Sequence, residues 1–141
     1  MPEKTFTLKI VTPEREVLND EVVSVTVPGT VGQFGVLADH APLISQTEIG
    51  VLGVMYPDGR EVEVALSGGY ATVRENELTV LVASAERADE IDVERAQAAR
   101  ERAEHRLAGE APDVDKARAE QALQRALTRL KVASWEQGGL P

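Results

Sequence analysis

The sequence changes character near Ser84, and this change constrains the fold more than any other feature. Before Ser84, apolar and polar residues alternate along short runs such as FTLKI (residues 6–10) and VSVTV (residues 23–27). After Ser84, β-branched residues become scarce, alanine and arginine dominate, and glycine is absent until Gly109. Alternation at period two is typical of half-buried strands, whereas the later composition is typical of helices. The sequence therefore predicts two units with a boundary near Glu86.

The first unit, residues 1–86, is predicted to be an antiparallel β-sandwich. Turn residues recur at the spacing that separates short strands in such folds, and we count roughly eight to ten strands. The clearest turn signals are Thr12-Pro13-Glu14, Pro28-Gly29, Pro57-Asp58-Gly59 and Arg74-Glu75-Asn76.

The second unit, residues 87–135, is predicted to be a hairpin of two antiparallel helices. Asp92 is a suitable N-cap for a helix that ends near Leu107. The segment 108–112 contains glycine and proline and breaks the chain, and Asp113 then caps a second helix that reaches about Ala133.

The seam between these two helices is predicted to be thin, because many of its residues are alanines. At about 25 cal/mol per Å² of buried apolar surface, such a seam gains only a few kcal/mol before conformational entropy is subtracted. The hairpin is therefore expected to be marginally stable, and residues 136–141, with Gly138 and Gly139, are expected to form a flexible tail. The predicted inward positions are Val93, Ala96, Ala103, Leu107, Leu123, Ala126, Leu127 and Leu130.

The charge distribution excludes a nucleic-acid-binding surface. The formal net charge is -9, and residues 1–86 hold 5 basic against 13 acidic side chains. Binding to phosphate backbones depends on clustered Lys and Arg, which this chain lacks over most of its length. The chain has no cysteine, no apolar run that could span a bilayer, and no signal-peptide layout at its start. We expect a soluble cytoplasmic protein that does not insert into the membrane.

Two short motifs invite an enzymatic interpretation, and neither supports one. Leu66-Ser67-Gly68-Gly69 resembles the signature loop of ABC transporter ATPases, but no phosphate-cradling G-x-x-x-x-G-K-[ST] segment is present. We therefore predict a tight turn in which glycine tolerates positive φ. Asp39-His40 offers neither a metal-ligand set nor a triad, since the other histidine, His105, lies far along a helix. The chain has no candidate catalytic residue and no candidate metal site.

The segment Ile91-Asp92-Val93-Glu94-Arg95-Ala96 and three later arginines form the most specific constellation. Arg95 and Arg102 are seven residues apart and share one helix face, and Arg125 and Arg129 are four apart and share a face of the second helix. Guanidinium groups suit phosphate oxygens, and a carboxylate accepts from an amine or a ribose hydroxyl. The alternative is a solvated helix face with ion pairs to neighbours such as Glu94 and Glu101.

These residues resemble the nucleotide-binding motif of the epsilon subunits of bacterial F-type ATP synthases. The N-terminal half agrees with the same family, because residues 32–43 (GQFGVLADHAPL) resemble its G-x-x-G-x-L-x-x-H-A-P-L stretch and Leu66-Ser67-Gly68-Gly69 is the usual companion. The resemblance spans nearly the whole chain. It implies an ATP site made of Glu86, Ile91, Asp92, Arg95, Ala96, Arg102, Arg125 and Arg129.

The family resemblance also implies a fold and a set of partners. The expected fold is a flattened ten-stranded β-sandwich followed by the two-helix hairpin, with the sandwich bound to the gamma subunit and the c-ring. The contact residues would be Val31, Gly32, Gln33 and His40. Gln33 stands where many relatives have Glu, and Ala38-Asp39 replaces the commoner Pro-Gly.

The implied function is that of a non-catalytic rotor subunit of the proton-translocating synthase, at the cytoplasmic face of the bacterial inner membrane. The hairpin would bind ATP as a regulatory ligand when folded, with no cofactor required. When extended, it would contact the alpha and beta subunits and inhibit ATP hydrolysis. A weak alanine seam suits a switch of this kind.

Two other classes of function remain to be compared with this one. A free-standing ligand-binding sandwich with a helical oligomerisation tail would need an aromatic-lined pocket, and aromatic residues make up only 4% of the chain. An enzyme would need a catalytic constellation, which the sequence does not offer.

Overall fold

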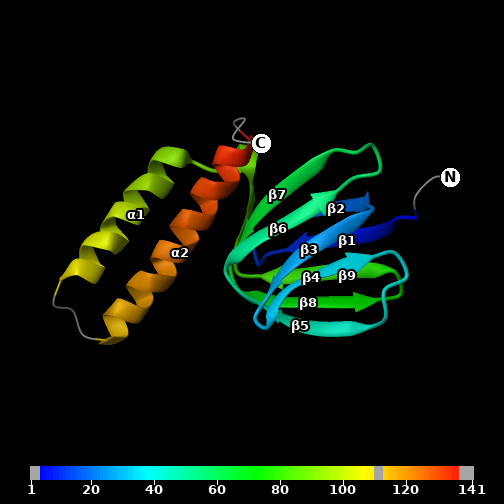
Figure 1. Cartoon of the computed structure of the whole chain (residues 1–141), viewed down its shortest axis with the longest axis horizontal. Helices are drawn as coiled ribbons and strands as arrows, with labels where there is room; N and C mark the ends of the chain where they lie inside the picture. The colour runs from blue at the N-terminus through cyan, green and yellow to red at the C-terminus, as the bar shows by residue number, and fades with distance from the viewer. Residues whose placement is uncertain (1–3, 110–112, 137–141) are drawn as a thin grey trace.

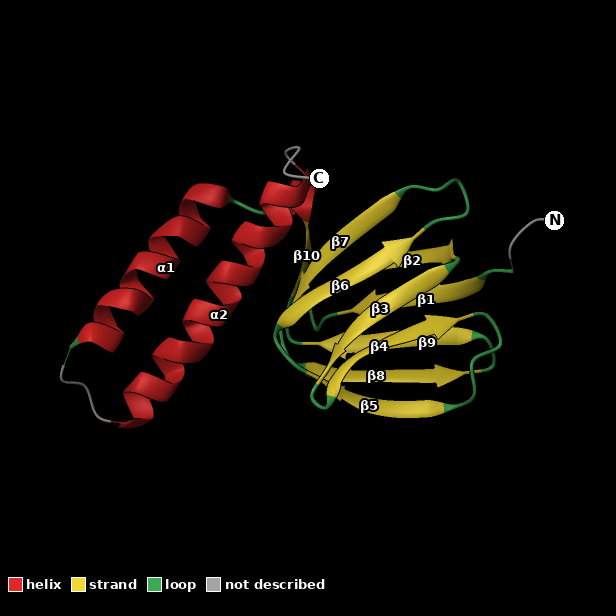
Figure 2. Cartoon of the chain, viewed as in Figure 1, coloured by secondary structure: helices red, strands yellow, loops and turns green. Residues whose placement is uncertain are grey.

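The alternating runs form strands and the alanine-rich segment forms helices, as the sequence predicts. Figure 1 shows a β-sandwich with a two-helix hairpin packed at one end, and Figure 2 shows the strand β10 beside the hairpin. The computed structural model describes residues 4–109 and 113–136. Residues 110–112 of the predicted turn and residues 137–141 of the predicted tail lie outside this range.

The described chain contains ten strands, which confirms the predicted ten-stranded sandwich. They are β1 (Phe6–Val11), β2 (Glu16–Val22), β3 (Ser24–Gly29), β4 (Gly32–Leu37), β5 (Leu43–Thr47), β6 (Gly50–Met55), β7 (Glu61–Leu66), β8 (Gly69–Arg74), β9 (Glu77–Val82) and β10 (Ala85–Arg87).

The strands form one continuous sheet that folds over on itself. The order is β10-β7-β6-β3-β5-β8-β9-β1-β2, with β4 paired to β3. All neighbouring pairs are antiparallel except β1 and β9, which run parallel. The prediction of a purely antiparallel sandwich is wrong at this point, because no hairpin turn links these two strands and so no local geometry dictates their relative direction.

The sandwich has its own hydrophobic core. Phe6, Leu8 and Ile10 are almost fully buried, while Thr7 and Lys9 between them are partly exposed. All members of the central cluster of buried apolar residues lie between Phe6 and Ala85. The core therefore draws on no helical residue.

The hairpin consists of a 3₁₀ turn and two helices. These are η1 (Ala88–Glu90), α1 (Val93–Ala108) and α2 (Asp113–Glu136). Helix α2 thus runs three residues past the predicted end. It contacts β7, β6 and η1 as well as α1, so α2 is the helix that joins the hairpin to the sandwich. Within the described residues, neither helix has an apolar stretch long enough to cross a membrane.

The seam between α1 and α2 is built from alanines, as predicted. Ala96 and Ala103 of α1 and Ala119 and Ala126 of α2 are each at most 3% exposed. The predicted inward positions Leu107, Leu123 and Leu130 are half-buried.

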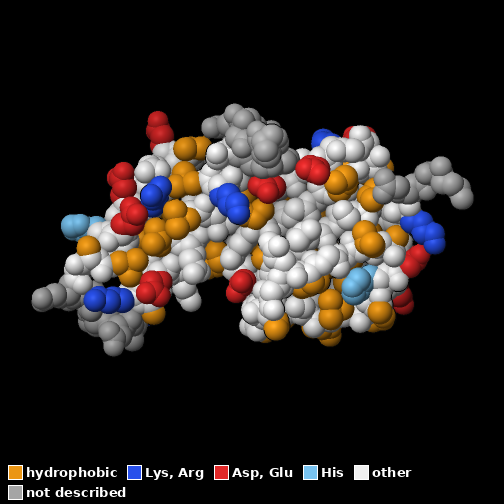
Figure 3. Space-filling view, in the orientation of Figure 1, with side chains coloured by type: hydrophobic (Ala, Val, Ile, Leu, Met, Phe, Trp, Pro, Cys, Tyr) orange, Lys and Arg blue, Asp and Glu red, His pale blue; other side chains and the backbone are white. Residues whose placement is uncertain are grey.

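Two of the predicted inward positions are wrong. Val93 is 38% exposed and Leu127 is 42% exposed. Each helical residue advances by about 100°, which places both side chains well to one side of the line of seam alanines. Figure 3 shows apolar side chains scattered among charged ones on the visible face of the hairpin.

The glycines at the start of β8 serve a different purpose from the one predicted. Among the described glycines, positive φ occurs at Gly32 and Gly59, not at Gly68 or Gly69. A Cβ added to Gly69 would instead lie 2.1 Å from the carbonyl oxygen of Leu81 on β9. Glycine is needed here because the backbones of two strands approach closely.

Gly69→Ala should therefore destabilise the sandwich by about 2–4 kcal/mol, because backbone atoms cannot move aside as a flexible side chain can. Urea denaturation followed by circular dichroism measures this change. Gly35→Ala is the matched control in β4, since a Cβ there meets nothing within 4 Å. Equal midpoints for the two variants would contradict the close-approach explanation.

Candidate functional site

The segment from Ile91 to Ala96 forms the start of α1. Asp92 is the N-cap, as predicted, and its Oδ1 accepts a hydrogen bond from the Arg95 backbone N–H at 3.0 Å. The Asp92 carbonyl oxygen accepts from the Ala96 N–H at 3.0 Å. Ala96 packs into the seam and Ile91 is half-buried, whereas Asp92 and Arg95 are exposed. This segment thus fixes the helix start and presents one carboxylate and one guanidinium to solvent.

An ion pair connects α2 to the sandwich. Nε of Arg129 donates a hydrogen bond to Oε1 of Glu86 on β10, and the two side chains are 31% and 29% exposed. Because Glu86 and Arg129 are 43 positions apart in sequence, only docking of the hairpin brings them together. Two of the predicted site residues therefore meet across the boundary between the two units.

A narrow crevice lies beside this ion pair. Arg125, Thr128 and Arg129 of α2 line one side, and Ser67 and Ser84 lie among the sandwich residues that line the other. Its volume is about 10 Å³, which is no larger than a water molecule. No nucleotide could fit inside this crevice between α2 and the sheet.

The two serines of this crevice hold each other in place. Ser84 N–H donates to Ser67 Oγ at 2.8 Å, and Ser67 Oγ donates to the Ser84 carbonyl oxygen at 3.2 Å. The sequence prediction treated Ser67 only as part of a turn. Nothing in the local pattern indicated that it would lie against Arg125, because α2 reaches it through tertiary packing.

Helix geometry places the arginines on one side of the hairpin. Arg95, Arg102 and Arg125 each come immediately before a buried seam alanine. In two antiparallel right-handed helices, residues one position before a seam residue point to the same side of the pair. Arg129 follows Arg125 by one helical turn and lies on that side as well. The four arginines thus share a face with Glu86.

The local ion pairs expected of a solvated helix face do not form in the part of the chain that the structure describes. Within residues 4–109 and 113–136, Arg95, Arg102 and Arg125 make no ion pair with Glu94, Glu101 or any other carboxylate. The ion pair that does form within α1 joins Arg100 to Glu104 at 3.5 Å. Positive charge is therefore left available along one face.

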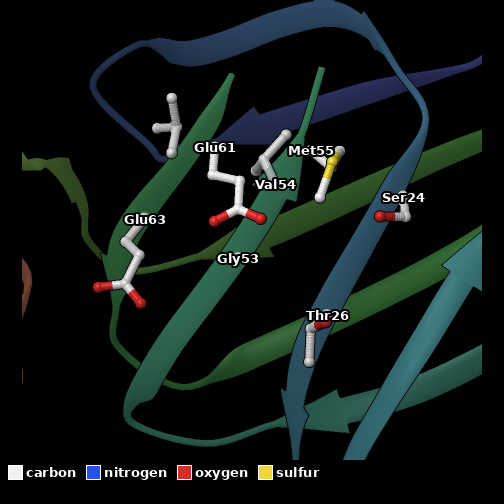
Figure 4. A pocket seen from close by; sticks show the side chains of 8 residues that line it. Ser24, Thr26, Gly53, Val54, Met55, Glu61 and Glu63 are labelled. Atoms are coloured by element: carbon white, nitrogen blue, oxygen red, sulfur yellow. The ribbon is translucent and has the colours of Figure 1, made fainter. Parts of the chain in front are cut away.

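A second concavity lies on the outer face of β3, β6 and β7 and has the opposite character. Its volume is about 210 Å³, and Figure 4 shows Glu61 and Glu63 on one side of Gly53 with Ser24 and Thr26 on the other. Burial raises the pKa of the Glu63 carboxyl, although the charge of Lys131 opposes this shift. A phosphate group would be repelled here, so this pocket does not compete with the arginine face as an anion site.

The residues expected to contact other subunits lie at both ends of β4. Val31, at 97% exposure, lies in the turn before the strand, and Gly32 and Gln33 are exposed at its start. His40 follows the end of the strand, where its Nδ1 lies 2.6 Å from the Ala41 carbonyl oxygen. Six residues of extended chain separate these ends by about 20 Å, so they do not form one loop.

Comparison with protein families covers both units of the chain. Residues 5–88 match the beta-sandwich domain of the ATP synthase Delta/Epsilon chain, and residues 89–134 match its long alpha-helix domain. The ATP synthase epsilon chain of Pelotomaculum thermopropionicum is 53% identical over 133 residues, which are 94% of this chain and 98% of that protein. The epsilon chain of Nitratidesulfovibrio vulgaris is 49% identical over 92% of this chain and 96% of its own length. The chain belongs to the ATP synthase epsilon chain family.

Solved structures agree with this family assignment. One similar chain comes from the cryo-EM structure of the Euglena gracilis mitochondrial ATP synthase, which contains OSCP, F1 and the c-ring. It aligns with a TM-score of 0.77 and 26% sequence identity. The match covers 92% of the present chain and 81% of the Euglena chain. A chain from the central stalk and c-ring of the Tetrahymena thermophila mitochondrial enzyme shares the fold, with a TM-score of 0.56 and 14% identity over 96% of this chain and 98% of that chain.

Proposed function

We propose that this chain is a non-catalytic subunit of the central stalk of a proton-translocating F-type ATP synthase. The sandwich joins the gamma subunit to the c-ring, and the hairpin regulates ATP hydrolysis. ATP is a regulatory ligand of the docked hairpin, and no cofactor is required. In the extended state the hairpin contacts the alpha and beta subunits and inhibits hydrolysis.

The observation that carries this proposal is the composition of the arginine face from both units. Glu86 belongs to the sandwich, and Arg95, Arg102, Arg125 and Arg129 belong to the hairpin. A ligand that contacts members of both units binds only while the hairpin is docked. Such a ligand necessarily stabilises the docked state over any undocked one.

The chemistry of the face suits a nucleoside triphosphate. Guanidinium groups donate paired hydrogen bonds to phosphate oxygens, and Arg95 and Arg102 are exposed to receive them. The free carboxylate oxygen of Asp92 is an acceptor for an amine or a hydroxyl group. Arg129 keeps its hydrogen bond from Nε to Glu86 and has its remaining guanidinium donors for a phosphate, so Glu86 stays part of the site.

The energies involved make a switch feasible. A ligand at about ten times its Kd stabilises the docked state by roughly 1.4 kcal/mol. The alanine seam and the limited contact of α2 with the sheet leave a stability margin of similar size. ATP concentration is then the signal, because plentiful ATP holds the hairpin down and depletion releases it.

The sandwich supplies the attachment to the rotor. Val31, Gly32, Gln33 and His40 are proposed to meet the c-ring and gamma, with the two ends of β4 making separate contacts. The similarity to chains from enzymes solved with their c-rings supports this role. The subunit is proposed to be peripheral, at the cytoplasmic face of the bacterial inner membrane.

The structure does not favour a free-standing ligand-binding sandwich. Side chains from all parts of the described sheet fill the interior in one cluster, and the concavities described above lie on the outside. A sandwich of this kind has no internal chamber for a small molecule.

Arg125→Ala should weaken ATP binding to the isolated chain by about 1.5–3 kcal/mol, because it removes a donor pair from the phosphates. Isothermal titration calorimetry measures the affinity, and no turnover of ATP is expected. Arg74→Ala is the control, since Arg74 is 80% exposed at the β8–β9 turn. Arg100 is a poorer control than its helical position suggests, because it is half-buried on α1, whereas Arg74 and its partner Glu75 are both largely exposed.

Equal affinities for wild type, Arg125→Ala and Arg74→Ala would show that the arginine face is merely solvated. Absence of binding at millimolar ATP would likewise contradict the regulatory role of the nucleotide.

Deleting all residues after Ala88 should raise ATP hydrolysis by the assembled enzyme while leaving synthesis coupled to proton flow. The sandwich keeps its complete core in this variant, so it should still join the rotor. Hydrolysis rates of membranes carrying wild-type or truncated chain test this expectation, with immunodetection of the chain confirming assembly. A truncated chain that assembles without raising hydrolysis would exclude the inhibitory role.

A further inference from the structure

The linker between the sandwich and the hairpin is tied to a distant turn of the sandwich. Nη2 of Arg15, in the turn between β1 and β2, lies 2.6 Å from Oε2 of Glu90 in η1. The other carboxylate oxygen of Glu90 accepts from the Arg87 backbone N–H at 3.0 Å, and Arg87 Nε lies 3.5 Å from it. Both oxygens of Glu90 are therefore engaged, and its side chain is only 23% exposed.

The turn that carries Arg15 is closed by two hydrogen bonds. Thr12 N–H donates to the Arg15 carbonyl oxygen at 2.9 Å, and Arg15 N–H donates to Thr12 Oγ1 at 3.3 Å. Thr12 is 8% exposed, which is unusual for a turn threonine and fixes this turn to the sandwich. Arg15 therefore projects from a turn that is hydrogen-bonded and anchored to the sandwich.

Glu90 is held in its ionised form at neutral pH. Burial alone would raise the pKa of its carboxyl, but the hydrogen bonds from Arg87 and Arg15 and the charges of both arginines outweigh burial and lower it. Asp89, the other carboxylate in η1, lies 3.6 Å from Arg87 Nε and does not pair with Arg15. The contact between Arg15 and Glu90 is therefore a charged pair that nothing else in η1 replaces.

The position of this pair determines where the hairpin can pivot. Residues 88–90 are held against the sandwich, and α2 packs on η1. Only Ile91 and Asp92 separate η1 from Val93, the first residue of α1, and both have extended backbone conformations. With the pair intact, these two residues are the free joint.

We propose that Arg15 and Glu90 are positioning residues that anchor the linker and thereby favour the docked hairpin. A short tether keeps the hairpin at high effective concentration near its docking face. Loss of the pair frees residues 88–90 as well, which lengthens the joint and raises the entropic cost of docking. The proposal deepens the proposed two-state hairpin, on which it rests, but it does not require nucleotide binding.

A single introduced cysteine can report undocking, because the natural chain has none. Val132 of α2 is fully buried and follows Arg125, which lines the crevice with the sandwich, by two helical turns, so Val132→Cys should react with a thiol reagent only when α2 leaves the sheet. Ala103→Cys, in the seam, reports separation of the two helices instead. Both measurements use the full chain without nucleotide.

In the Val132→Cys background, Arg15→Gln and Glu90→Gln should each increase the rate of thiol modification about three- to tenfold. The double variant should react no faster than the faster single variant, because both changes remove the same contact. Arg15→Lys should restore most of the protection, since it keeps the charge. The Ala103→Cys reporter should change by less than twofold.

Lys9→Gln is the matched control. It removes a similarly exposed ion pair, between Lys9 and Glu77 at 3.1 Å, that holds two sandwich strands and does not touch the linker. It should leave the rate at Val132→Cys unchanged.

Three results would overturn the proposal. The first is an unchanged rate in Arg15→Gln and Glu90→Gln, and the second is an equal increase in Lys9→Gln. The third is an equal increase at both reporter positions, because this would indicate general loosening of the hairpin. None of these outcomes bears on ATP affinity, so failure here is distinguishable from failure of the proposed nucleotide site.

Discussion

The packing of α2 against β6 and β7 is the contact on which the arrangement of the two units depends. Helix α1 contributes little apolar area, because its buried residues are the alanines Ala96 and Ala103. Helix α2 buries Val132 and Ala133 near its C-terminal end, where it packs on the sheet and on η1. A hairpin with so little buried surface would gain too little to offset its conformational entropy if it stood alone. Packing against the sandwich supplies the remaining stabilisation of the hairpin.

This dependence explains why the arginine face and the docking of the hairpin cannot be separated. Arg129 carries a charge that would be costly to leave without a partner in a half-buried position. Glu86 forms an ion pair with Arg129 across the boundary between the two units, beside a crevice that is too small for any ligand. The arginine face therefore exists in its observed form only while α2 is docked. Any ligand that recognises it is coupled to the position of the hairpin by thermodynamic necessity.

Much of the fold could be predicted because its signals are local. Alternation located β1 and β3, Asp92 located the start of α1, and Glu75 and Asn76 occupy the predicted turn with positive φ. The parallel pairing of β1 with β9 could not be predicted, because the two strands are brought together only by the folding of the whole sheet. The need for glycine at position 69 could not be predicted for the same reason. It arises from the close approach of the Leu81 backbone and not from the local turn.

The candidate site could be predicted in its residue types but not in its pairing. Spacing placed Arg125 beside Arg129 and Arg95 in line with Arg102, since helical periodicity is regular. Spacing could not place Ser67 against Arg125, nor Arg15 against Glu90, because these contacts join elements that are distant in sequence.

The pairing of Arg129 with Glu86 has a consequence for how a regulatory site responds to ligand. An arginine face with every guanidinium open would bind a polyphosphate tightly and would stay saturated across a wide range of concentrations. A phosphate that shares Arg129 with Glu86 gains less than it would from an unpaired guanidinium, so the net affinity is lowered. The carboxylate keeps the unliganded protein stable and moves the response to higher ligand concentrations. In the proposed function, this sharing allows a common metabolite to act as a signal, because a sensor is informative only when its affinity lies near the concentration it reports.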